Sequence, residues 1–185
     1  ANLNGANLSK ADLRMVSFVN LDLRGADLNK ADLAGADLSA VDLTGGNLIL
    51  SDLAGADLSG ANLTEVDLSG TNLTAANLTA ANLTSAIAIQ TNLTNANLTN
   101  ANLDGAFLYG ATLVKTDLSN ANLTHVKLSG ADLRLANLTG AKANDDLFPE
   151  KQPGWFSAKM PIEVSWNYSG ITSFEFRGEK IYFTS

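Results

Sequence analysis

The chain has 185 residues, a formal net charge of −7 at pH 7 and no cysteine. A chain of this length is typical of one domain. The lack of cysteine excludes disulfide bonds, thiolate chemistry and cysteine-ligated metals. No apolar run approaches the roughly 18 residues that a membrane-spanning helix needs.

Residues 1–143 repeat with a period of five. Leucine occupies 26 of the 28 positions from Leu3 to Leu138 in steps of five, and only Phe18 and Ala88 differ. Successive leucines would drift by roughly 140° around an α-helix and would alternate between the two faces of a straight strand. The chain must therefore bend once in every repeat.

Each repeat has an extended part and a corner. A small residue and the leucine point to one side of a short extended segment, and the Asn or Asp between them points to the other. The next two residues form the corner, where glycine is frequent because it tolerates positive φ. Irregularities recur at multiples of twenty residues, as in Ser51, Thr71 and Thr91 or Ile87 and Phe107. This spacing predicts four repeats per coil and about seven coils.

The repeat matches a known consensus. Residues 26–30 (ADLNK) and 96–100 (ANLTN) fit the pattern A(D/N)LXX, and residues 1–143 resemble the pentapeptide-repeat family in an unbroken register. The resemblance implies that family's fold, which is an all-β, right-handed quadrilateral β-helix, a form of solenoid.

Residues 144–185 have a different composition, with all three prolines and nine of the twelve aromatic residues. Alternating apolar residues predict strands at 162–168, 174–176 and 181–183, with residues 177–180 as a turn. An open solenoid end needs a cover, so this segment is predicted to be a C-terminal capping segment, as a short β-meander, or a dimer contact. A small recognition module is the alternative. The candidate contacts are Trp155, Phe156, Trp166, Phe174 and Phe176.

No group of residues predicts catalysis. His125 is the only histidine and falls at a corner, where we expect a solvated turn residue. Catalytic carboxylates need a cleft that perturbs their pKa, and a flat-sided coil without inserted loops offers none. We therefore predict a protein that is not an enzyme and needs no metal or other cofactor.

Acidic residues concentrate in the first half of the repeat. Residues 1–70 contain ten acidic and four basic residues, whereas residues 71–143 contain three and four. The candidate acidic patch consists of Asp12, Asp32, Asp37, Asp52 and Asp57. Such a surface repels nucleic acid and attracts basic protein surfaces.

The resemblance adds one interpretation of this charge. Some pentapeptide-repeat proteins resemble DNA in shape and charge and bind DNA gyrase, protecting it from quinolones or inhibiting it. A DNA-mimicking modulator of gyrase, a type II topoisomerase, is therefore an alternative function. The chain departs from those proteins because it lacks projecting loops, has leucine where they use more phenylalanine, and is nearly neutral in its second half.

An apolar stripe is predicted on one side of the coil. With four repeats per coil, six outward residues fall on one face: Ile49, Leu50, Ile87, Ile89, Phe107 and Tyr109. Outward apolar residues clustered in this way usually mark a contact surface. Three occupants remain open, namely the aromatic tail of the same chain, another protein, and a second copy of the chain.

The leading interpretation is a non-enzymatic rigid scaffold for protein–protein interaction. Its partner is an unidentified protein or a homodimer mate, with no direct binding of nucleic acid or membrane. A row of hydroxyls on another face leaves an ice- or surface-binding protein as a third alternative. Because the chain begins inside the repeat without Met, we expect a processed or trimmed N-terminus. Cytoplasm, periplasm and thylakoid lumen all remain open, with a bacterial or organellar origin favoured.

Overall fold

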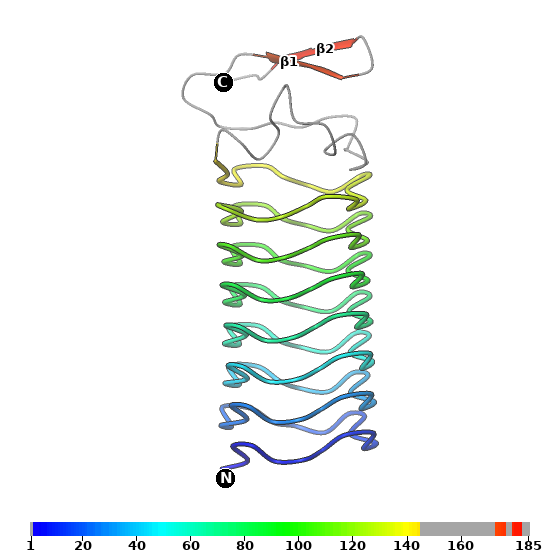
Figure 1. Ribbon diagram of the computed structural model, residues 1–185, viewed down its shortest axis with the longest axis vertical. Helices are drawn as coiled ribbons and strands as arrows, with labels where there is room; N and C mark the ends of the chain where they lie inside the picture. The colour runs from blue at the N-terminus through cyan, green and yellow to red at the C-terminus, as the bar shows by residue number, and fades with distance from the viewer. Residues whose placement is uncertain (1, 145–172, 177–178, 183–185) are drawn as a thin grey trace.

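The computed structural model describes residues 2–144, 173–176 and 179–182. Residues 2–144 wind into a coil whose successive turns stack along one axis (Figure 1). Isolated parallel bridges join residues twenty positions apart, from Asn2 and Asp22 to Asn122 and Lys142. Four pentapeptides therefore make one turn of the coil, as the sequence predicted.

The coil has four faces, each built from one pentapeptide per turn. The first face begins with residues 2–5, the second with 6–10, the third with 11–15 and the fourth with 16–20. Positions that differ by twenty form a column along a face, and we use these face numbers below.

Three hydrogen bonds per repeat join neighbouring turns, and a fourth closes the corner. The Leu58 N–H donates to the carbonyl of Asn77 at 2.7 Å, and the Asn77 N–H donates to the carbonyl of Ala56 at 2.9 Å. The Gly60 N–H reaches the Thr79 carbonyl at 2.9 Å, and the Ala61 N–H reaches the Leu58 carbonyl at 3.0 Å. This pattern satisfies the backbone, as burial of the coil wall requires.

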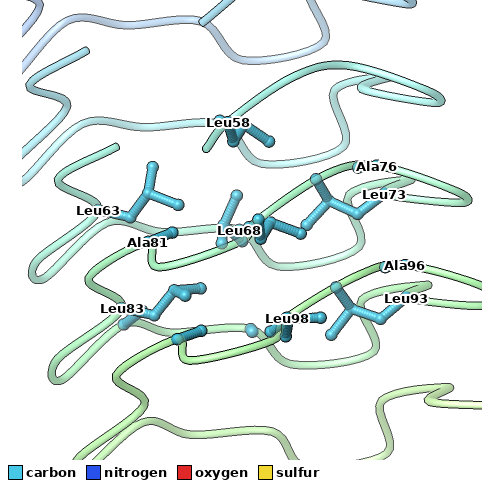
Figure 2. Packing of buried hydrophobic residues seen from close by; sticks show 14 of the residues in the cluster. Leu58, Leu63, Leu68, Leu73, Ala76, Ala81, Leu83, Leu93, Ala96 and Leu98 are labelled. Carbon is cyan, nitrogen blue, oxygen red and sulfur yellow. The ribbon is translucent and has the colours of Figure 1, made fainter. Parts of the chain in front are cut away.

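Leucine and alanine fill the interior. In the five-residue series from Leu23 to Leu138, the leucines are at most 3% exposed. Leu63, Leu68 and Leu73 project into the coil from successive faces (Figure 2). Phe18 is also buried, with 5% exposure. Since four leucines share one level, only small residues fit beside them, and this explains the alanine in each repeat.

The second corner residue has a positive φ throughout the coil. The values run from 52° at Ala40 to 75° at Gly130, whether or not the residue is glycine. A positive φ at the third residue of a four-residue turn is typical of type II turns. The left-handed region costs a residue with a Cβ about 1–2 kcal/mol, so the coil holds many mildly strained corners.

Ala80→Gly is expected to raise the free energy of unfolding by about 0.5 kcal/mol, because relief of the left-handed backbone exceeds the entropy that glycine loses. Ala80 has a φ of 56°. Its neighbour Ala81 is 1% exposed, so Ala81→Gly is the matched control and should destabilise the coil. Urea unfolding followed by circular dichroism measures both. A less stable Ala80→Gly protein would contradict the strain at the corners.

The named strands among the described residues follow the coil in sequence. Strand β1 (Ser173–Phe176) pairs antiparallel with β2 (Glu179–Tyr182), and Ser173 is paired with Tyr182 in this register. Phe174 and Phe176 lie in β1, as predicted.

The predicted turn at 177–180 is wrong in its second half, because Glu179 and Lys180 belong to β2. Glu179 pairs with Phe176 and Lys180 with Glu175 in the register of the two strands. The predicted strand at 162–168 and the contacts Trp155, Phe156 and Trp166 lie outside the described residues.

Candidate interaction surface

The six predicted stripe residues all lie on the second face. Bridges join Asp67 to Ile87, Ile87 to Phe107, and Phe107 to Lys127. The Gln90 N–H donates to the carbonyl of Tyr109 at 2.8 Å. One turn, containing Ser69 and Gly70, separates Ile49 and Leu50 from the four residues farther along the face.

Four of the six stripe residues are exposed to solvent. Leu50 is 57% exposed, and Ile89, Phe107 and Tyr109 are each 38% exposed, whereas Ile49 and Ile87 are half-buried. The rings of Phe107 and Tyr109 lie with their centroids 6.2 Å apart and a tilt of 40°. The exposed apolar surface is therefore centred on two adjacent turns of the coil.

Leu50 extends the stripe across the next turn, whose outward residues on this face are Asp67 and Ser69. A Cβ added to Gly70 would lie 2.7 Å from the Leu50 Cδ2 atom. The Leu50 side chain thus occupies the space over Gly70, and a side chain at this corner would have to displace it. Glycine at position 70 keeps the stripe apolar at a level where the wall residue is Asp67.

Ala88 lies beneath the stripe and changes its corner. Ala88 is buried, with 2% exposure. In the other described repeats, the N–H that follows the corner donates to the carbonyl at the leucine position, as Ala61 does to Leu58. The equivalent bond from Thr91 to Ala88 is missing. The Thr91 hydroxyl donates to the Leu68 carbonyl at 2.7 Å. The corner that holds Ile89 therefore has one backbone hydrogen bond fewer than its neighbours.

In the wall column, which holds the residue before each leucine position, charged residues border the two apolar residues Ile87 and Phe107. Asp67 precedes Ile87, and Lys127 follows Phe107. The Asp67 carboxylate is half-buried and accepts the Ser69 N–H at 2.9 Å. Lys127 is exposed and forms no ion pair within residues 2–144. Asp67 and Lys127 were not predicted as part of this surface, although their spacing of sixty residues, which is three turns of the coil, places them in one column.

Other exposed apolar residues were also missed. Met15 is 79% exposed, Leu135 is 60% exposed, and Val16 and Val19 in the first turn are close to 40% exposed. Leu135 and Met15 both stand at the second corner position, where side chains point outward, so their repeat position was the available signal. Met15 and Leu135 lie on the third face, six turns apart, and Val16 and Val19 lie on the fourth, so none of them lies on the second face.

The five residues of the acidic patch lie on two adjacent faces. Asp12, Asp32 and Asp52 form a column on the third face, and Asp37 and Asp57 are paired on the fourth. Each carboxylate accepts the N–H two residues ahead, as in the bond of 3.0 Å from Ala54 to Asp52. These bonds close the corner in the way that Asn and Asp favour in turns, so aspartate has a structural role here.

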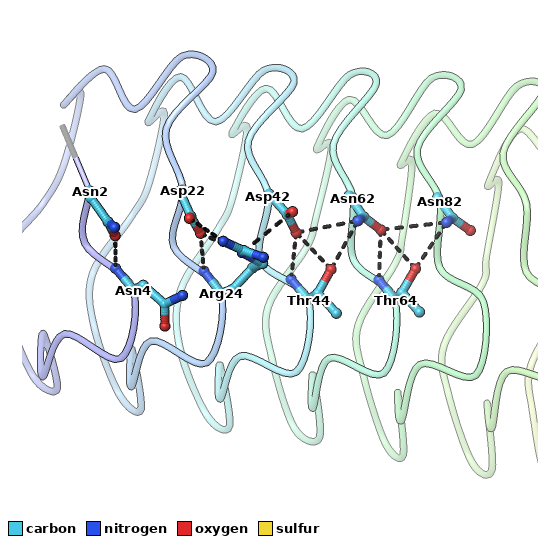
Figure 3. Close-up of polar contacts among 9 residues, drawn as sticks. All are labelled: Asn2, Asn4, Asp22, Arg24, Asp42, Thr44, Asn62, Thr64 and Asn82. Atoms are coloured by element: carbon cyan, nitrogen blue, oxygen red, sulfur yellow. Dashed lines mark hydrogen bonds and ion pairs between the residues drawn. The ribbon is translucent and has the colours of Figure 1, made fainter.

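Asparagine at the same position links one turn to the next. The Asn62 side-chain amide donates to Asp42 Oδ1 at 3.3 Å and to Thr44 Oγ1 at 2.9 Å. Asn82 repeats the contact with Thr64 at 2.9 Å, and Figure 3 shows the resulting ladder along the first face. A carboxylate can only accept, so a column of aspartates lacks these links and concentrates negative charge.

Two arginines neutralise part of this charge. Arg14 lies 2.7 Å from Asp12 and 3.4 Å from Asp32, and its hydrogen bond lowers the pKa of Asp12 to about 2. The equivalent bond from Arg24 lowers the pKa of Asp22 to about 2. Within the described part of the chain, Asp37, Asp52 and Asp57 have no ion pair. They form the uncompensated part of the acidic patch.

His125 has a partner that the sequence did not predict. It is exposed at a corner, as expected, but its Nδ1 lies 2.8 Å from Asp104 Oδ1. The Thr124 hydroxyl donates to the same oxygen at 2.8 Å, and hydrogen bonds from His125 and Thr124 lower the pKa of Asp104. In residues 2–144 and the two strands, no three His, Cys, Asp or Glu side chains are grouped to hold a metal ion. Within the same ranges, no helix has the length and apolarity needed to cross a membrane.

A coil with four five-residue repeats per turn, a leucine interior and backbone hydrogen bonds between neighbouring turns defines the class of quadrilateral β-helical solenoids. The family model described as pentapeptide repeats matches eight copies, over residues 1–39, 36–74, 76–114 and 116–145. The chain belongs to the pentapeptide-repeat family, whose fold is the right-handed quadrilateral β-helix. No curated protein sequence matches it.

Solved structures of the family match the chain. A pentapeptide-repeat protein from the cyanobacterium Cyanothece 51142 is 28% identical, with a TM-score of 0.52, over 70% of this chain and 90% of its own. HetL, involved in heterocyst differentiation regulation in Nostoc sp. strain PCC 7120, is 30% identical over 85% and 82% of the two chains, with a TM-score of 0.42. QnrB1, a plasmid-mediated fluoroquinolone resistance protein, is 23% identical over 78% of each chain, with a TM-score of 0.48.

Proposed function

We propose that the chain is a non-enzymatic rigid scaffold that presents the stripe on its second face to a protein. The observation that carries the proposal is the exposure of Leu50, Ile89, Phe107 and Tyr109 along one face. Equivalent outward positions on other faces hold mostly Ser, Thr, Asn and Asp. Burial of this surface by a partner removes apolar area from water, which drives most protein association.

The coil suits this role because its wall is held by hydrogen bonds between every pair of neighbouring turns. Side chains at fixed positions in such a wall keep their spacing, so a partner meets a pre-organised surface. Pre-organisation reduces the entropy that binding costs. The scaffold thus contributes positions, and the stripe contributes the contact.

The double variant Ile89→Asp with Tyr109→Asp is expected to lose capture of the partner, because two charges would have to be desolvated in the contact. The matched control is Thr99→Asp with Ser119→Asp, which alters the same repeat position on the fourth face. Affinity capture from an extract of the source cell, followed by mass spectrometry, compares both variants with the wild type.

A protein retained by the wild type and the control, but absent with the stripe variant, supports the proposal. Equal capture by all three would contradict it. Circular dichroism checks the β-structure. If the stripe variant unfolds while the control remains folded, the stripe is a buried contact with the chain's own aromatic tail, and the proposal fails.

A DNA-mimicking modulator of gyrase is the second candidate. It is favoured by the uncompensated carboxylates of Asp37, Asp52 and Asp57, which form a negative surface on two adjacent faces of the coil. This candidate requires that micromolar protein changes gyrase supercoiling in a salt-dependent way. Unchanged supercoiling across a range of salt would remove it.

Ice or surface binding receives less support. The hydroxyls of Ser39, Thr79 and Thr139 on the fourth face donate to the Asp or Asn two residues earlier at 2.7 Å. Their orientation is therefore set by the corner and not by an outward array. Normal ice growth in the presence of the protein would exclude this function.

A further inference from the structure

We infer that the second face pairs with a second copy of the same chain, with the two coils antiparallel; this inference rests on the proposed function and names its partner. The wall column of this face contains Asp67, Ile87, Phe107 and Lys127 at successive turns. It therefore has an acidic end, two apolar levels and a basic end, and this order is complementary to its own reverse.

A two-fold axis relates the two copies in this pairing. The axis lies in the plane of contact, at right angles to the coil, between the levels of Ile87 and Phe107. It keeps each column opposite the same column and reverses the order of turns. Ile87 then faces Phe107 of the second copy, and Asp67 faces Lys127 of the second copy at both ends of the contact. The contact is isologous, as in most symmetric dimers.

The neighbouring column obeys the same symmetry. It contains Ser69, Ile89, Tyr109 and Ser129, so Ile89 meets Tyr109 of the second copy, and a serine meets a serine at each end. The apolar levels coincide and the polar levels coincide in both columns. Apolar side chains therefore lie at the centre of the contact and polar groups at its rim, as in stable interfaces.

Charge decides between the two possible two-fold arrangements. If the axis ran along the coil, the copies would be parallel, and Asp67 would face Asp67 while Lys127 faced Lys127. Juxtaposed like charges oppose association. Lys127, which has no ion pair within residues 2–144, gains a carboxylate partner only in the antiparallel arrangement.

The size of the contact sets its strength. Four levels at the strand spacing of about 4.8 Å span only about 15 Å. Standard stable interfaces bury about 800 Å² on each partner, which this contact does not reach. We therefore expect a reversible dimer that forms at tens to hundreds of micromolar protein.

Sedimentation equilibrium of the full chain with charge reversals tests the pairing. Asp67→Lys and Lys127→Asp should each weaken dimerisation at least fivefold, and the double variant should restore it, because the reversed charges again face each other. Both residue types already occupy this repeat position elsewhere, as Asp117 and Lys142, so folding should be preserved. A monomeric wild type at several hundred micromolar, or a double variant no better than the singles, would overturn the inference.

Cysteine pairing reads the orientation directly, since the chain has no cysteine of its own. Under mild oxidation, Asp67→Cys and Lys127→Cys proteins should each form no disulfide-linked dimer alone, and their mixture should give a disulfide-linked heterodimer. A linked homodimer of either variant alone would show parallel copies and overturn the inference.

Different experimental results would contradict the homodimer and the proposed contact surface. A monomeric wild type that still captures another protein through Ile89 and Tyr109 would defeat the homodimer alone. A dimer that forms equally well with Ile89→Asp and Tyr109→Asp would defeat the role of the stripe in both.

Discussion

Replacing Leu78 with alanine is expected to lower the free energy of unfolding by about 3–4 kcal/mol, the usual cost of removing a buried leucine side chain. Leu78 has no exposed surface and lies near the middle of the coil. Its neighbours are fixed by the hydrogen bonds of the wall, so they cannot collapse into the cavity. Since each turn contacts only the turns next to it, the loss should also weaken the coupling between the two halves of the coil.

Leu135→Ala is the matched control, because Leu135 is 60% exposed and its loss should cost well under 1 kcal/mol. Urea unfolding followed by circular dichroism gives both values. Similar losses for the two variants would contradict a core formed by the leucine position of the repeat.

Deletion of residues 96–100 is expected to preserve the coil but abolish contact through the second face. Apart from the corner at Ala88 and the two end turns, the described repeats have the same backbone hydrogen bonds, so loss of one repeat should leave the β-structure intact. All later residues move by one face. Phe107 and Tyr109 then lie on the first face, while Ile87 and Ile89 remain on the second, and Lys127 leaves the column of Asp67.

Deletion of residues 131–135 is the control, because it removes one repeat beyond Lys127 and leaves the stripe whole. Circular dichroism should give similar spectra for the two deletions. Capture of the partner and self-association should survive only in the control. Contact that is retained after deletion of 96–100 would show that the alignment of Ile89 with Tyr109 is not required.

Much of the coil could be predicted from the sequence, since one physical constraint repeats without interruption. The five-residue spacing of leucine excludes helix and straight strand, and like residues such as Ser51, Thr71 and Thr91 reveal the twenty-residue turn because neighbouring turns stack like on like. The bridges confirm this turn at every face. Knowledge of the turn then placed Ile89 and Tyr109 on one face.

The backbone conformation of the corners and the contacts between side chains of neighbouring turns could not be predicted from residue types alone. Ala40, Leu50 and Lys115 adopt positive φ although they are not glycine, because the closed coil imposes one corner conformation on every repeat. The partner of His125 is Asp104, one turn away. A contact of this kind requires the exact path of the corner as well as the column.

The borders of the stripe show the same limit. The sequence predicted the apolar residues of the stripe but not the role of Asp67 and Lys127, because charged residues are common at this repeat position. Their meaning depends on order within one column, acidic before and basic after two apolar levels. The hairpin boundaries were also misjudged, as Glu179 and Lys180 joined β2.

Site-specific photo-cross-linking in the source cell tests the contact role of the stripe most directly. A benzophenone amino acid replaces Tyr109 in one protein and Ser119 in another, the same repeat position on opposite faces. We predict a discrete covalent adduct with a protein, either a second copy or another chain, at position 109 and none at position 119. No adduct at 109, or the same adducts at both positions, would contradict a contact surface on the second face.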